Sequence, residues 1–419
     1  MMDMPVPDWF SKLKGFWRMR KLKQVLKIII RYGLILVNDC LIQLPVHRGR
    51  VLFESFNGKG LTDNPKAIYD ELLQEYPNRR TELIWGVKGE FYQEMVTRFP
   101  EAHVVKRWSF AWLWASATAE YWIFNSRMPT WWKKNRQTTY VQTWHGTPLK
   151  HLALDMDQVK LPGNSRERYL KEFVRESDRW DYLVAANQYS ADIFKRAFSF
   201  HHHFLKTGYP RNDVLFQQNN TSTITQLKQK IIGRPDCRVV TYAPTWREDD
   251  FIKVGEYHFR WHFDLGEMLQ VLPEDVVLLV RPHYLVTDHI DVSEFEDRVV
   301  VDSTSDMSEI YLITDLLITD YSSVMFDFAN LRRPMLFFAY DLDYYRDDLR
   351  GFYFDYYHEL PGPIATTAPE LLQEVRKLAQ NDFAILDWQQ FDRFAQRFVQ
   401  WEQGDAAQQI IKKIHYGRN

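Results

Sequence analysis

Short apolar segments alternate with amphipathic segments along this chain from Pro45 onward. The short segments are rich in β-branched and aromatic residues, as buried strands are, whereas the segments between them carry apolar residues at helical spacing. In the first half we predict strands at Val51–Phe56, Leu83–Val87, His103–Val105, Trp122–Asn125, Tyr140–Trp144, Tyr182–Ala185 and Leu205–Thr207, with helices such as Pro65–Tyr76, Phe91–Arg98 and Ser165–Ser177. This alternation predicts an α/β fold with a mostly parallel sheet covered by helices.

The alternation restarts after a polar stretch, Gln217–Thr225, which we interpret as a connection between domains. A chain of 419 residues is also too long for one ordinary core. We predict one doubly wound domain over residues 46–225 and a second over 226–419, the latter closed by helices between Pro369 and Ile414. Its strands are predicted at Arg238–Ala243, Val276–Val280, Arg298–Val301, Leu316–Thr319 and Met335–Phe338. A ligand is then expected in the cleft between the carboxyl edges of the two sheets, the layout of a two-domain nucleotide-dependent transferase.

The segment before the first strand, residues 1–45, has a different character. Between residues 12 and 31 it contains eight Lys and Arg residues and no acidic residue, with Leu, Phe, Trp, Val and Ile interleaved at near-helical spacing. Such a basic amphipathic helix suits the anionic cytoplasmic surface of a membrane, so we expect peripheral attachment there. The alternative is a helix that packs on the protein and leaves its basic face in water. The apolar run over residues 28–37 is interrupted by Arg31 and is shorter than the roughly 20 residues that span a bilayer.

Composition narrows the class of partner and cofactor. The formal net charge of −2 argues against bulk nucleic-acid binding. Two distant cysteines form no ligand pattern, which indicates a reduced, cytoplasmic protein without structural zinc. Three successive histidines, His201–His203, cannot all converge on one ion, because neighbouring residues on a strand point to opposite faces. We therefore expect no metal and no cofactor.

The segment Tyr140–His151 places a histidine at the end of a predicted strand. The strand stops abruptly at His145-Gly146, followed by Thr147 and Pro148. An unperturbed pKa near 6.5 suits histidine to accept a proton at neutral pH. His145 is thus a candidate general base, and a satisfied core histidine is the alternative.

Other predicted strand ends carry polar groups as well. Arg281 and His283 follow one buried strand, and Asp320, Ser322 and Ser323 follow another, where the start of the next helix could hold a pyrophosphate or merely be capped. Thr245 and Arg247 follow a third strand, and Arg247 could reach a phosphate or lie at the surface. Asn64 and Lys66 follow a glycine-containing loop that could bind phosphate weakly or be an ordinary βα turn.

Together these motifs resemble the CDP-glycerol glycerophosphotransferase family, whose members build wall teichoic acid. The matching stretches are Thr143–Lys150, Tyr242–Arg247, Arg281–His283, Thr319–Ser323, Arg350–Tyr353 and Pro361–Pro363, in the expected order over roughly residues 50–365. Each motif is weak alone, but their joint order is specific.

The resemblance implies a GT-B fold of two Rossmann-like domains, with an acceptor domain followed by a CDP-polyol-binding domain. It implies transfer of glycerol phosphate, or sometimes ribitol phosphate, from the CDP-linked donor to a hydroxyl of an undecaprenyl-diphosphate-linked acceptor, with release of CMP. His145 would be the base, Arg281 and His283 would neutralise the phosphates, and Ser322 and Ser323 would bind them; the other candidates, Gly146 and Thr147 among them, would line the substrate site.

Two alternatives are a GT-B glycosyltransferase that uses a UDP-sugar, and an inactive membrane-binding scaffold. The choice between glycerol and ribitol, between one added unit and a polymer, and the oligomeric state are open at this point.

Overall fold

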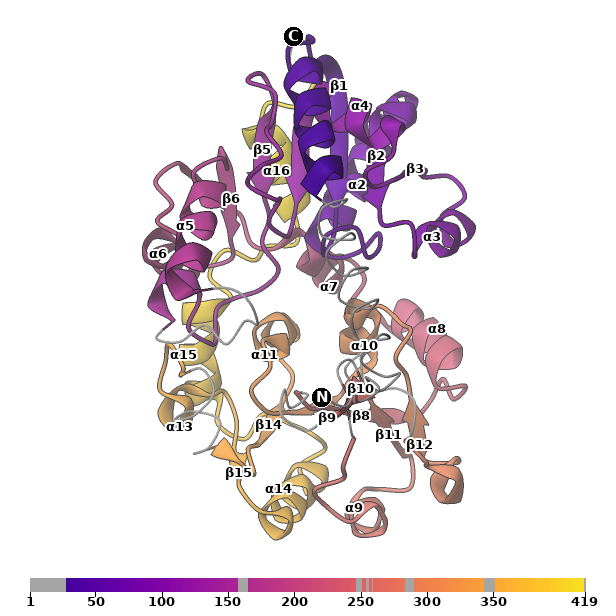
Figure 1. The fold of residues 1–419 in the computed structure, drawn as a ribbon. Helices are drawn as coiled ribbons and strands as arrows, with labels where there is room; N and C mark the ends of the chain where they lie inside the picture. The colour runs from indigo at the N-terminus through magenta and orange to yellow at the C-terminus, as the bar shows by residue number, and fades with distance from the viewer. Residues whose placement is uncertain are drawn as a thin grey trace, which may run out of the picture.

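The computed structural model describes residues 28–156, 165–245, 251–253, 256–257, 259–282, 290–342 and 351–417. They form two α/β domains, each built on a parallel sheet, as the alternation of segments predicts (Figure 1). The first domain occupies the upper half of the view and the second the lower half.

The first domain contains a seven-stranded sheet in the order β3-β2-β1-β4-β5-β6-β7, with every neighbouring pair parallel. The strand order reverses beside β1, so the loops after β1, β4 and β5 lie at the switch point where open α/β sheets bind ligands. Its strands are β1 (His47–Glu54), β2 (Leu83–Val87), β3 (His103–Lys106), β4 (Ala119–Phe124), β5 (Thr139–Gln142), β6 (Tyr182–Ala185) and β7 (His203–Lys206), and its helices are α2 (Asp63–Glu75), α3 (Tyr92–Arg98), α4 (Phe110–Thr118), α5 (Arg166–Ser177) and α6 (Gln188–Ala197).

The second domain contains a six-stranded parallel sheet in the order β12-β11-β8-β13-β14-β15, and its order reverses beside β8. The strands are β8 (Arg238–Ala243), β11 (Val276–Val280), β12 (Val299–Val301), β13 (Leu316–Thr319), β14 (Met335–Phe338) and β15 (Ile364–Ala365), with a separate hairpin of β9 (Phe251–Lys253) and β10 (Glu256–Tyr257). The helices after β7 are α7 (Asp213–Gln217), α8 (Thr221–Ile231), α9 (Leu265–Val271), α10 (Met307–Ile313), α11 (Val324–Phe328), α13 (Tyr356–Glu359), α14 (Ala368–Gln380), α15 (Trp388–Phe398) and α16 (Ala406–Lys413).

All twelve predicted strands are present, with ends that shift by a few residues, and β9, β10 and β15 are additional strands. The predicted connection at Gln217–Thr225 is partly helical instead. The Asn220 side chain accepts a hydrogen bond from the backbone N–H of Thr223 and starts α8 at Thr221. The polar composition of this stretch therefore reflects a helix cap and an exposed first turn rather than an extended linker.

The last helix departs from the expectation that the closing helices stay with the second domain. Ala407, Ile410 and Ile411 of α16 share a buried core with Ile68 of α2 in the first domain. In Figure 1, α16 accordingly lies among the indigo and purple elements of the first domain. The Tyr416 hydroxyl, just after α16, donates a hydrogen bond of 2.8 Å to the carbonyl of Gly49. The chain thus crosses from the second domain back to the first, and the apolar side chains of α16 complete the core of the first domain.

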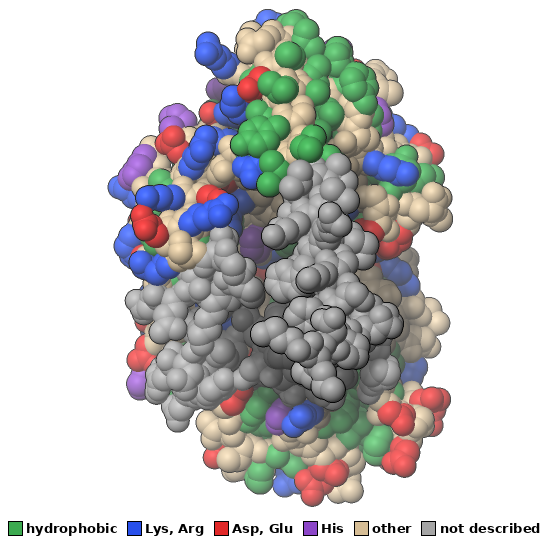
Figure 2. Space-filling model, in the orientation of Figure 1, with side chains coloured by type: hydrophobic (Ala, Val, Ile, Leu, Met, Phe, Trp, Pro, Cys, Tyr) green, Lys and Arg blue, Asp and Glu red, His purple; other side chains and the backbone are tan. Residues whose placement is uncertain are grey.

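Residues 28–41 form a helix that packs on the first domain with one face only. Leu34 and Leu41 contact the core, and the Asn38 side chain accepts a hydrogen bond from the backbone of Lys133 at 3.0 Å. The opposite face exposes large apolar side chains, including Ile29 and Leu36, and contributes to the green patch at the top of Figure 2. Among the helices of the described residues, none combines the length and the apolar character needed to cross a bilayer.

Candidate active site

The loop after β5 holds His145 beside the switch point of the first sheet. The Asn64 side chain is fully buried, and its amide donates to the carbonyls of Thr143 (3.4 Å) and Trp144 (3.1 Å). Trp144 adopts φ +53°, a conformation that turns the chain sharply before the histidine. The imidazole stacks against the Trp144 indole, with 4.5 Å between ring centres, and lies 5.8 Å from the Phe56 ring. The loop backbone and the flanking rings thus give His145 a defined position.

Hydrogen bonding selects the protonation pattern of His145. Its Nδ1 lies 2.8 Å from the carbonyl oxygen of Asn125, at the end of β4. A carbonyl only accepts, so Nδ1 carries the hydrogen and Nε2 of the neutral ring has the free lone pair. This arrangement suits a general base that acts through Nε2.

The surroundings of His145 lower its pKa below the ordinary value of 6.5. Burial by the protein around the ring is the main cause, while the Asn125 carbonyl and Asp63 act in the opposite direction and Arg211 in the same one. The residue nevertheless keeps a large solvent-accessible surface. A pKa below 6.5 leaves the imidazole neutral at pH 7.

The His145 loop meets the second domain at the start of α11. A Cβ atom added at Gly146 would lie 3.5 Å from the Ser323 hydroxyl and 3.6 Å from Nη2 of Arg211. The loop that carries the predicted base therefore lies beside Ser323, one of the two predicted phosphate-binding serines, which comes from the other domain.

Arg211 forms hydrogen bonds with both domains, at the His145 loop and at α11. Its Nη1 donates to Asp63 (2.6 Å) and to the backbone carbonyl of His145 (2.8 Å), and its Nη2 donates to Asp327 of α11 (2.8 Å). Its backbone N–H also donates to the Asn64 side chain at 3.2 Å. The two carboxylates raise the pKa of Arg211 further, against the effect of burial, so the guanidinium stays charged. Sequence reasoning did not single out this arginine, because its partners are distant in the sequence.

The loop after β13 provides the candidates of the second domain. Asp320 is buried, and its carboxylate accepts a hydrogen bond of 2.8 Å from the backbone N–H of Thr245, after the neighbouring strand β8. Ser323 stands at the N-cap of α11 but makes no capping hydrogen bond with its side chain. The Ser322 hydroxyl accepts a long contact of 3.5 Å from the N–H of Val324. Helix capping therefore does not occupy the Ser323 hydroxyl, which lies beside Gly146.

Arg281 is held by a different loop. Its guanidinium donates to the carbonyl (3.0 Å) and carboxylate (3.3 Å) of Asp302 and to the carbonyl of Ser305 (2.8 Å). Burial lowers the pKa of Arg281, and Asp302 opposes this effect. These contacts join the start of the loop after β11 to the turn at Asp302–Ser305, after β12. His283 and Arg247 lie outside the described residues.

The remaining candidates in the first domain make contacts within the protein. Thr147 is buried, and its hydroxyl accepts a hydrogen bond of 3.3 Å from the Asn187 amide. Lys66 pairs with Asp70 at 2.6 Å, one turn further along α2. Their role as substrate ligands stays a prediction, while their present contacts, like those of Asn64, support the loop and the helix beside it.

Two sequence motifs pair with one another directly. Lys150 and Phe352 form an antiparallel bridge, and the backbone N–H of Tyr353 donates to the carbonyl of Leu149 at 3.0 Å. The Tyr353 hydroxyl donates to Asp155 at 2.8 Å. The segment after His145 is therefore anchored to the second domain, a contact between distant segments that neither motif indicates by itself. In the described part of the chain, no three His, Cys, Asp or Glu side chains are grouped as metal ligands.

Comparison with known proteins agrees with this architecture. The sequence profile of the CDP-Glycerol:Poly(glycerophosphate) glycerophosphotransferase family matches residues 36–416. The teichoic acid poly(glycerol phosphate) polymerase of Bacillus subtilis is 42% identical over 89% of this chain, which spans only 49% of that longer protein. The teichoic acid glycerol-phosphate transferase of Staphylococcus aureus is 43% identical, with 94% of this chain and 99% of the relative covered. The solved structure of the wall teichoic acid polymerase TagF has 38% identity and a TM-score of 0.81 over 95% of this chain and 97% of TagF. The chain therefore belongs to the CDP-glycerol:poly(glycerophosphate) glycerophosphotransferase family.

Proposed function

We propose that this protein transfers glycerol phosphate from CDP-glycerol to a hydroxyl of an undecaprenyl-diphosphate-linked acceptor and releases CMP. The observation that carries the proposal is the contact between the His145 loop and Ser323 across the two domains, in a chain of this family. Two findings on relatives support it. The S. aureus relative, matched over nearly its whole length, is a teichoic acid glycerol-phosphate transferase, and one TagF structure was obtained after a soak with CDPG.

The reaction needs an alcohol that is activated at neutral pH. Nε2 of His145 accepts the proton of the acceptor hydroxyl as its oxygen attacks the β-phosphorus of CDP-glycerol. A new P–O bond forms to the acceptor, the P–O bond to CMP breaks, and CMP leaves with the electron pair. The hydrogen bond from Nδ1 to the Asn125 carbonyl stabilises the imidazolium that results.

The second domain holds the donor in this proposal. The Ser322 and Ser323 hydroxyls bind the diphosphate next to the histidine loop, and Asp320 fixes the loop after β8 through Thr245. We expected Arg281 to neutralise the phosphates, but its hydrogen bonds commit the guanidinium to the turn at Asp302–Ser305. The proposal therefore leaves this neutralisation mainly to His283 and Arg247, and gives Arg281 the role of holding the turn at Asp302–Ser305.

Membrane attachment is a separate part of the proposal. The helix over residues 28–41 exposes Ile29 and Leu36 by 61% and 67%, although its opposite face is packed on the first domain. Together with the basic residues between 12 and 31, this apolar face suits the surface of an anionic cytoplasmic leaflet. Peripheral attachment would bring the site to a lipid-linked acceptor.

The decisive experiment measures the leaving group. The protein is incubated with a short lipid-linked acceptor and either CDP-glycerol, CDP-ribitol or UDP-sugars, and CMP and UDP are separated and quantified. CMP formation that depends on acceptor and CDP-glycerol supports the proposal; UDP formation indicates a glycosyltransferase, and no nucleotide release indicates a scaffold.

His145→Ala should reduce turnover by roughly 10²–10⁴-fold, whereas His201→Ala, at an exposed histidine elsewhere, should not. A loss of only a few-fold in a folded His145→Ala protein would remove the base assignment.

A further inference from the structure

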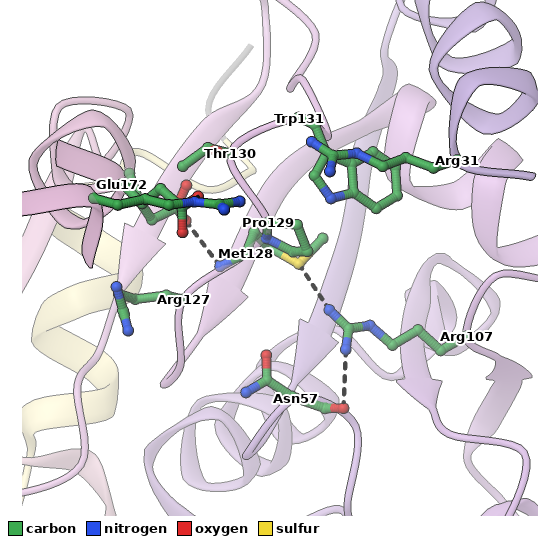
Figure 3. Close-up of a pocket in the computed structure, with 11 residues that line it drawn as sticks. Arg31, Asn57, Arg107, Arg127, Met128, Pro129, Thr130, Trp131 and Glu172 are labelled. Atoms are coloured by element: carbon green, nitrogen blue, oxygen red, sulfur yellow. Dashed lines mark hydrogen bonds and ion pairs between the residues drawn. The ribbon is translucent and has the colours of Figure 1, made fainter. Parts of the chain in front are cut away.

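A cavity of about 390 Å³ lies in the first domain, between the helix over residues 28–41 and α5. Figure 3 shows that its walls come from separate elements. Asn57 follows β1, Arg107 follows β3 and Arg127 follows β4, so the cavity is at the carboxyl edge of the sheet. Arg31 and Trp131 close its upper side in that view. Four arginines line the cavity in all, the fourth being Arg168 of α5.

Two of these arginines have carboxylate partners. Arg107 pairs with the buried Glu54 at 3.2 Å, and its Nη1 donates to the Asn57 carbonyl at 3.2 Å. Arg168 pairs with Glu172 at 3.1 Å. Their charges are therefore largely compensated within the protein.

The other two arginines contact aromatic rings instead. The Arg127 guanidinium lies 4.3 Å from the centre of the Phe173 ring, and that of Arg31 lies 5.4 Å from the Trp131 ring. Among the residues that the structure describes, no carboxylate pairs with Arg127 or Arg31. Stacking keeps the planar guanidinium ordered while its N–H groups remain available, which is how arginine is prepared for bidentate phosphate binding.

Two lining residues of the cavity, Asn57 and Arg127, closely follow residues that contact the candidate base. The carbonyl of Asn125, which binds Nδ1 of His145, lies two residues before Arg127. On the other side, Phe56 contacts the His145 ring and directly precedes Asn57. Since β1, β4 and β5 are neighbours in the sheet, a ligand in the cavity would lie beside His145, on the first-domain side of the site.

We propose that this cavity binds phosphate groups of the acceptor, with Arg127 and Arg31 as the ligands that hold them. The inference rests on the proposed function, because it assumes that the acceptor carries phosphates. Charge-assisted, bidentate hydrogen bonds from guanidinium groups fit phosphate oxygens well. Held in this way, the acceptor chain would present its terminal hydroxyl to His145 while the donor stays in the second domain. Arg127 and Arg31 are acceptor-binding residues and take no part in proton transfer.

Steady-state kinetics separates acceptor binding from chemistry. Arg127→Gln and Arg31→Gln are compared with Arg98→Gln, an exposed arginine over the Phe99 ring (5.5 Å) that does not line the cavity. Each cavity variant should raise KM for a short soluble acceptor by about ten-fold or more, with kcat and the donor KM changed by less than about two-fold. Arg127→Lys, which keeps the charge, should recover part of this loss. An unchanged acceptor KM in the Arg127→Gln, Arg31→Gln double variant would overturn the proposal.

Two binding measurements avoid any dependence on turnover. Inorganic pyrophosphate is titrated into the protein by calorimetry with CMP present to occupy the donor site; Arg127→Gln should bind it at least about ten-fold more weakly than the wild type and Arg98→Gln. Equal pyrophosphate binding by all three would refute the site.

Vesicles of phosphatidylglycerol should bind Arg127→Gln as well as the wild type. Loss of vesicle binding with unchanged acceptor KM would assign the cavity to lipid headgroups and overturn the acceptor role. If the wild type releases no CMP with any acceptor, the proposed function fails, whereas the pyrophosphate comparison still tests the cavity.

Discussion

Glu402 gives a prediction that can be worked out from the structure. Its carboxyl group is buried, and it accepts hydrogen bonds of 3.0 Å from the backbone N–H of Tyr209 and from the Asn212 side chain. Burial raises the pKa of Glu402 to about 8 and the nearby Asp327 and Asp213 add to this, while its hydrogen bonds act in the opposite direction. The group is therefore mostly protonated in the folded protein at neutral pH.

The pH dependence follows from the difference between the folded and unfolded states. Between the ordinary pKa of 4.5 and about 8, the folded protein keeps a proton that the unfolded chain has released. The free energy of unfolding therefore decreases as pH rises through this window, by up to about 1.4 kcal/mol per pH unit. Glutamine imitates the protonated acid and lacks this dependence. Glu402→Gln should thus gain about 2–3 kcal/mol relative to the wild type between about pH 5.5 and 7.5.

Urea unfolding followed by tryptophan fluorescence at several pH values measures this gain. Glu94→Gln serves as the control, since Glu94 is exposed in the first turn of α3. Its stability should run parallel to that of the wild type across the pH range. A constant difference between Glu402→Gln and the wild type over the same range would show that Glu402 is ionised in the folded protein, and would refute the reasoning.

Three further predictions concern the site and the membrane. Because the pKa of His145 is lowered, the acid limb of the kcat/KM profile for CMP release should lie below pH 6.5 and disappear in His145→Ala; a limb at or above 6.5 would contradict this. Arg211→Met removes the ion-pair partner of two mostly buried carboxylates, Asp63 and Asp327. Urea unfolding should therefore show a free energy of unfolding lower by about 3 kcal/mol or more, and CMP release should fall as well. An unchanged free energy of unfolding would show that these ion pairs do not stabilise the protein. Leu36→Glu, at a residue 67% exposed, should weaken sedimentation with phosphatidylglycerol vesicles, whereas Leu386→Glu, at a residue 49% exposed in the second domain, should not. Equal sedimentation of both variants would assign the exposed face of the helix another role.

The contacts of Arg211 also link stability to chemistry. The same guanidinium binds the His145 backbone in the first domain and Asp327 in the second, next to the Ser323 hydroxyl. A change in the angle between the domains would therefore move the proposed base relative to the proposed phosphate-binding serines. Arg211 acts as a positioning residue, and its substitution should affect turnover more than the binding of either substrate alone.

The sequence alone determined the local secondary structure of this protein. Buried parallel strands are nearly continuous apolar runs, so all the predicted strands, from Val51–Phe56 to Met335–Phe338, could be recognised from neighbouring residues. The place of His145 at a strand end follows from the same local pattern. Its Nδ1 partner and its contact with the second domain do not, because they involve segments far apart in the chain.

Only the tertiary structure decided which distant groups meet. The return of α16 to the first core, the pairing of Lys150 with Phe352 and the three partners of Arg211 all join segments whose separation in the sequence carries no signal of contact. The arginine cavity is of the same kind, since each of its cations looks like an ordinary surface residue in the sequence. Folding brings the charges together at one sheet edge, and their availability to a ligand depends on which carboxylates come within reach.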